Sequence, residues 1–138
     1  MGFVRNRIDI EEMLDANTTE WKKLNDSEYK EIIQKWRDSF EEKAINNNPT
    51  LSHDKAIYKL QENLPFNGYL FNLPGYKHLP VTASPHDPTF GYRIENINKI
   101  ERKKLNDFQA IICKDDFSFT CVFNHEGQAC VPEYYFES

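Results

Sequence analysis

The amino-acid sequence predicts an α+β domain in which N-terminal helices pack on one face of a C-terminal antiparallel sheet of about four to five strands. The first half of the chain carries apolar residues at helical spacing. From Phe66 onward, aromatic and β-branched residues occur in short runs separated by Pro and Gly, which is typical of strands joined by turns. The 138 residues, 39% of them hydrophobic, suffice for one core, so we expect a single domain over residues 1–138.

The clearest helical pattern runs from Ser27 to Ile45. Apolar residues fall on one face of this segment, at positions Tyr29, Ile32, Ile33, Trp36 and Phe40. Asp26 or Ser27 is expected to cap the N-terminus by accepting an early backbone N–H. The segment Asn46-Asn47-Asn48-Pro49 is expected to end the helix, because Pro49 cannot continue it.

Two shorter helices are expected on either side of this one. The first spans Ile8 to Leu14. Acidic residues lie in its first turn, where they interact favourably with the helix dipole. The second begins after Ser52 as its N-cap and ends at Pro65. A short helix at residues 21–24 is also compatible with the sequence.

The second half contains the strand candidates. These are residues 66–73, 79–83, 89–95, 108–114, 117–123 and 129–136. The continuous apolar run Ala110–Cys113 indicates a central strand. Asp115-Asp116 is interpreted as a turn, and Asn124-His125-Glu126-Gly127 as a hairpin connection in which Gly127 is free to take a positive φ.

The charge and cysteine content restrict the class of protein. The formal net charge of −5 argues against nucleic-acid binding, since phosphate contacts need clustered Lys and Arg. No apolar run is long enough to cross a membrane, and the N-terminal segment has no signal-peptide core. The three cysteines, an odd number without short spacings, favour reduced thiols in a cytoplasmic protein.

No catalytic, metal or cofactor site is expected. Cys113, Cys121, Cys130 and His125 could in principle hold zinc, but their spacings do not match the paired ligands of zinc sites. The sequence leaves open whether these four side chains cluster in space. A Cys–His nucleophile is also conceivable, but nothing in the sequence brings a Cys and a His together.

The acidic, aromatic tail is the predicted binding surface. From Asp107 onward the sequence contains six acidic residues and a single basic residue, Lys114. Aromatic residues are interspersed among them. Tyrosine is enriched at interfaces, and acidic patches speed docking onto basic partners. The expected partner-binding residues are Asp115, Asp116, Glu126, Glu133, Tyr134 and Tyr135.

The chain resembles small bacterial immunity proteins, the antidotes of contact-dependent inhibition and other polymorphic toxin systems. The resemblance lies in the size, the acidity, the helical first half and the aromatic hairpin with its segments Phe117–Phe123, Asn124-His125-Glu126-Gly127 and Tyr134-Tyr135-Phe136. It implies a cytoplasmic protein that neutralises a cognate toxin, often a basic nuclease, by covering its active site. No individual residue role follows from the resemblance.

The leading hypothesis is therefore a cytoplasmic binding protein that neutralises a basic toxin or another protein partner, with no catalysis of its own. One alternative is a small Cys- or His-dependent hydrolase or a ribonuclease-type toxin. A second alternative is a homodimer that resembles secretion chaperones.

Overall fold

The computed structural model describes residues 2–76, 83, 85–101, 104–105, 109–124 and 133–138. Its helical elements are α1 (Gly2–Asn17), α2 (Asp26–Trp36), the π-helical turn η1 (Arg37–Glu41), α3 (Glu42–Ile45) and α4 (Asp54–Glu62). Its strands are β1 (Glu20–Lys23), β2 (Leu51–Ser52), β3 (Phe66–Phe71), β4 (Gly91–Ile97), β5 (Ala110–Lys114), β6 (Phe119–Phe123) and β7 (Glu133–Glu137). The α+β class predicted from the sequence is confirmed.

The strands form one antiparallel sheet in the order β1-β4-β3-β5-β6-β7-β2. These seven strands, counted over the described residues, exceed the four to five expected. The additional strands β1 and β2 come from the predicted helical half, and each pairs with a strand distant in sequence. The helix suggested at residues 21–24 is therefore wrong. Ser52 lies in β2, and the N-cap of α4 is His53.

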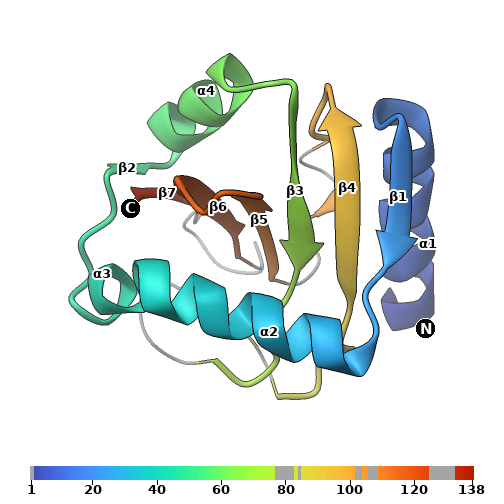
Figure 1. Cartoon of the computed structure of the whole chain (residues 1–138), viewed down its shortest axis with the longest axis horizontal. Helices are drawn as coiled ribbons and strands as arrows, with labels where there is room; N and C mark the ends of the chain where they lie inside the picture. The colour runs from blue at the N-terminus through green and yellow to red at the C-terminus, as the bar shows by residue number, and fades with distance from the viewer. Residues whose placement is uncertain (1, 77–82, 84, 102–103, 106–108, 125–132) are drawn as a thin grey trace.

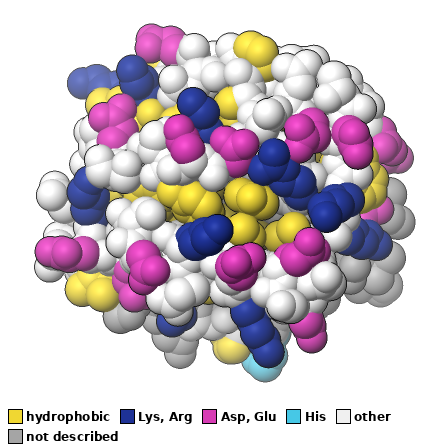
Figure 2. All heavy atoms as spheres, in the orientation of Figure 1, with side chains coloured by type: hydrophobic (Ala, Val, Ile, Leu, Met, Phe, Trp, Pro, Cys, Tyr) yellow, Lys and Arg dark blue, Asp and Glu magenta, His cyan; other side chains and the backbone are white. Residues whose placement is uncertain are grey.

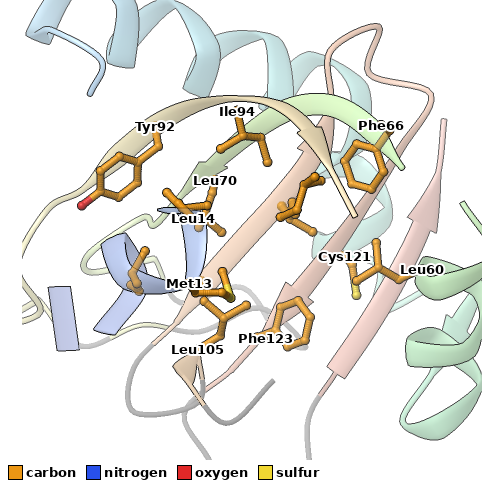
Figure 3. Close-up of a cluster of buried hydrophobic side chains, with 14 of the residues drawn as sticks. Met13, Leu14, Leu60, Phe66, Leu70, Tyr92, Ile94, Leu105, Cys121 and Phe123 are labelled. Carbon is orange, nitrogen blue, oxygen red and sulfur yellow. The ribbon is translucent and has the colours of Figure 1, made fainter. Parts of the chain in front are cut away.

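Helices cover both faces of the sheet, so the expected packing on one face is wrong. In β5, Ala110 and Ile112 belong to a core cluster with α1 and α4, whereas Ile111 and Cys113 belong to a second cluster with α2 and α3. Figure 1 shows α2 crossing in front of the sheet and α1 on its other side. Figure 3 shows the first cluster, in which Met13 lies near Leu105 and Phe123.

The expected helix over residues 27–45 is confirmed as a continuous helical run made of α2, η1 and α3. Its N-cap is Asn25, one residue before the expected caps, because Asn25 and Glu28 form a reciprocal capping box. At the other end Asn47 takes a φ of 52°. The N–H groups of Asn47 and Asn48 bond back to the carbonyls of Ala44 and Lys43, and this motif ends the helix before Pro49.

Five of the strand candidates correspond to β3, β4, β5, β6 and β7, with boundaries that differ by a few residues. The candidate at residues 79–83 and the hairpin connection at residues 125–127 fall almost entirely outside the described residues. Every residue of β6 is buried, because helices cover both faces of this strand.

Candidate functional site

The expected binding residues do not share one surface among those that the structure describes. Asp115 and Asp116 lie in the turn between β5 and β6. The register of β6 with β7 pairs Phe119 with Glu137 and Phe123 with Glu133. Glu133 therefore lies at the end of β7 that is remote from the acidic turn. It is also only 1% exposed.

The two tyrosines lie on opposite faces of β7, as the alternation along a strand requires. Tyr135 is buried, and its hydroxyl accepts a hydrogen bond of 3.0 Å from Asn63. Tyr134 is partly buried, with its ring 5.9 Å from the ring of His53. Glu126, the last of the expected residues, lies outside the described part of the chain. The tail thus supplies core packing through both tyrosines.

A different surface brings aromatic and charged side chains together. The helix α2 crosses the sheet near one end of β3, where the Tyr29 hydroxyl donates to the backbone oxygen of Asn72. Beyond this helix, side chains of neighbouring strands remain partly exposed on the same face. We call this surface the open sheet face, and it comprises Lys22, Tyr69, Arg93, Glu95, Asp115 and Phe117.

The centre of the open sheet face is a stack of three side chains. The guanidinium carbon of Arg93 lies 5.2 Å from the centroid of the Tyr69 ring. The Phe117 ring stacks against Tyr69 at 5.9 Å with an interplanar angle of 28°. Arg93 is fixed from its other side, because its Nε donates to Glu95 at 2.8 Å and its Nη2 to Asp115 at 3.5 Å. Contacts within the chain therefore hold the stack in place.

Phe117 has a φ of 58°, which is a rare conformation for a bulky side chain. The turn enforces it: the N–H of Phe117 bonds to the Lys114 oxygen, and the N–H of Ser118 bonds to Asp116 Oδ1. Local strain of this kind persists where the surroundings determine it, and it concentrates at functional sites. Here it places an aromatic ring, partly exposed, on the open sheet face.

Among the described residues named below, carboxylates outnumber basic groups around this stack. The surrounding carboxylates are those of Glu20, Glu28, Glu31, Glu95, Asp115 and Asp116, and the cations are Lys22, Arg93 and Lys114. A hollow of about 200 Å³ lies between α2 and the strands. Figure 2 shows hydrophobic side chains across the centre of this view, bordered by charged side chains.

Two of these carboxylates are held ionised by local hydrogen bonds. The side chain and backbone N–H of Ser118 lower the pKa of Asp116. The backbone N–H of Asn25 lowers the pKa of Glu28, with help from Lys22. These two carboxylates therefore stay ionised at a lower pH than ordinary ones.

The described cysteines do not suit nucleophilic chemistry. Cys113 and Cys121 are both fully buried, and burial raises the pKa of the Cys113 thiol. Cys130 and His125 lie outside the described residues. Within the described ranges no group of His, Cys, Asp and Glu side chains is arranged to hold a metal ion, and no helix there has the length and apolar character to span a membrane.

No local sequence pattern indicates the open sheet face. Its central residues come from β3, β4 and the β5–β6 turn, which are far apart along the chain. Tyr69 and Arg93 lie in strands that the sequence predicts, but their stacking depends on the register of β3 with β4. Of the expected binding residues, Asp115 belongs to the open sheet face and Asp116 lies beside it among the surrounding carboxylates.

Comparison with known proteins does not identify a relative. No protein-family model, no curated protein and no solved structure matches this chain.

Proposed function

We propose that this chain is a binding protein without catalysis of its own, which neutralises a basic protein partner, such as a cognate toxin, by covering it with the open sheet face. The stack of Arg93, Tyr69 and Phe117 within a rim of carboxylates is the observation that carries the proposal. Arginine and aromatic residues dominate binding energies at protein interfaces. A carboxylate rim attracts a positively charged partner and selects against an acidic one.

Preorganisation strengthens this case. Arg93 is held by two carboxylates, and the Phe117 ring is fixed by its turn. A side chain that is already ordered loses little entropy when a partner binds, so more of the contact energy contributes to affinity. The surface therefore has the properties of an interface more than those of a soluble strand face.

The test compares capture of a partner, from extracts of cells that encode the chain, by three forms of the protein. Phe117→Asn removes the ring and keeps the turn, because Asn tolerates a positive φ. Tyr58→Gln is the matched control, since Tyr58 is an aromatic residue 64% exposed on α4. We expect wild type and Tyr58→Gln to retain one basic protein that Phe117→Asn loses.

The captured protein is then purified and tested alone. We expect it to form a one-to-one complex whose affinity falls as salt concentration rises, because the rim acts through screened charges. We also expect the partner to harm growth when expressed alone and to be harmless when the chain is expressed with it. Retention by Phe117→Asn, an acidic partner, or undiminished toxicity in the complex would each overturn the proposal.

A further inference from the structure

A larger hollow lies on the other flank of α2, between the helix and the loop that follows β3. Its volume of about 570 Å³ is within the range of small-ligand pockets, roughly 300–1,000 Å³. One part of its lining is apolar and another is polar. The apolar residues are Tyr29, Ile33 and Leu73, and the polar groups belong to Arg37, Glu41 and Tyr76.

The π-helical turn η1 contributes both Arg37 and Glu41 to this hollow. Side chains four residues apart are neighbours on a helix surface, and Arg37 and Glu41 are spaced in this way. Both side chains therefore line the same flank. Such turns occur frequently at functional sites.

The polar groups are arranged as a site for a cation. The Tyr76 hydroxyl donates to Glu41 Oε2 at 3.1 Å, which fixes the carboxylate beside the ring. The guanidinium carbon of Arg37 lies 6.0 Å from the centroid of the Tyr76 ring, and its Nε lies 3.6 Å from the same Glu41 oxygen. A ring face next to a carboxylate attracts ammonium and guanidinium groups. In the free protein Arg37 itself takes this place.

Arg37 holds this position weakly. Its distances to the ring and to the carboxylate are near the outer limits for a cation–π contact and an ion pair. The side chain is also 45% exposed, so water screens the attraction. Little free energy is therefore lost when Arg37 leaves this position.

We propose that this hollow binds a cationic side chain, an arginine or lysine of the protein partner, which displaces Arg37 from Tyr76 and Glu41. The inference rests on the proposed function, because it takes the partner to be basic. It adds a second contact point, one that the predicted binding residues do not include.

The test uses a small probe, so that it does not depend on the partner. Nα-acetyl-arginine amide is titrated into isotope-labelled protein and followed by NMR, with the neutral Nα-acetyl-citrulline amide as the matched control. We expect shifts at the hollow with the arginine probe alone. Arg37→Gln should tighten this binding about two- to fivefold, because the competing cation is gone. Glu41→Gln should abolish it.

Two results would overturn the inference: equal shifts with the citrulline probe, or binding that Arg37→Gln leaves unchanged or weakens. Arg37→Gln keeps the test decisive if Glu41→Gln disturbs the π-helical turn, since Arg37 is half-exposed and its loss leaves the fold intact. If the arginine probe does not bind while Phe117→Asn still loses the partner, the cation site in this hollow is excluded and the proposed function stands. If the arginine probe binds as expected but Phe117→Asn retains the captured protein, the proposed function is excluded instead.

Discussion

Replacing Thr120 by valine should destabilise the protein through a buried hydrogen-bond chain. Trp36 and Thr120 are both fully buried. The indole N–H of Trp36 donates to Thr120 Oγ1 at 3.1 Å, and this hydroxyl donates to the backbone oxygen of Ile112 at 2.8 Å. Valine has nearly the same shape as threonine, so the substitution removes the hydroxyl and leaves the packing almost unchanged.

The expected loss follows from the groups left behind. A buried donor without an acceptor costs about 1–3 kcal/mol, and here the indole N–H becomes such a donor. In a Trp36→Phe background that donor is absent, so Thr120→Val should cost less by about 1 kcal/mol or more. The two substitutions should therefore couple in a double-mutant cycle.

Urea unfolding of the four proteins measures this coupling. With a urea m-value of about 2 kcal/mol/M, a loss of about 2 kcal/mol lowers the midpoint by about 1 M. Far-UV circular dichroism and a second probe that does not depend on Trp36 should give the same unfolding midpoints. If the two changes in unfolding free energy add to within about 0.5 kcal/mol, the hydrogen bond between Trp36 and Thr120 does not contribute as argued.

Three further predictions concern stability. Because the Asn25 N–H holds the pKa of Glu28 below its ordinary value of 4.5, the stability it gives is lost as pH falls through that lowered pKa, and Glu28→Gln should flatten the acid side of a pH–stability profile. Burial raises the pKa of Tyr135 from 10.0 to about 12, so unfolding should become easier between these pH values, and Tyr135→Phe should reduce this loss. Gly68→Ala should lower the unfolding free energy by about 2 kcal/mol or more in urea titrations, since its Cβ would lie 2.1 Å from the Cys113 carbonyl oxygen.

The central sheet and the long helix could be predicted from local patterns. The apolar face of residues 27–45 requires a helix, and the run Ala110–Cys113 requires a buried strand. That same run also indicates burial on both faces, since a strand with one solvated face alternates. The prediction that helices pack on only one face of the sheet is inconsistent with this indication. In the structure both faces of β5 are buried, because α1 and α2 pack on opposite sides of it.

The edge strands and the open sheet face could not be predicted in this way. β1 has the sequence Glu-Trp-Lys-Lys, whose charges suit an exposed edge and carry little strand signal. It is a strand because β4 lies beside it. The stack of Tyr69, Arg93 and Phe117 likewise depends on pairing between distant segments and on one unusual turn, so no local pattern reveals it.

The two hollows lie on opposite flanks of α2, and this arrangement leads to a final prediction. A helix is about 10–12 Å across, whereas a standard interface covers about 800 Å² on each partner. If the proposed partner seats on the outer surface of α2, it should therefore reach both hollows at once. In a complex with the captured partner, Phe117→Asn and Glu41→Gln should each weaken binding, and their free-energy effects should add, because the two sites share no contacts. If only one of the two weakens binding, the partner covers a single flank, and α2 marks the edge of the interface instead of its centre.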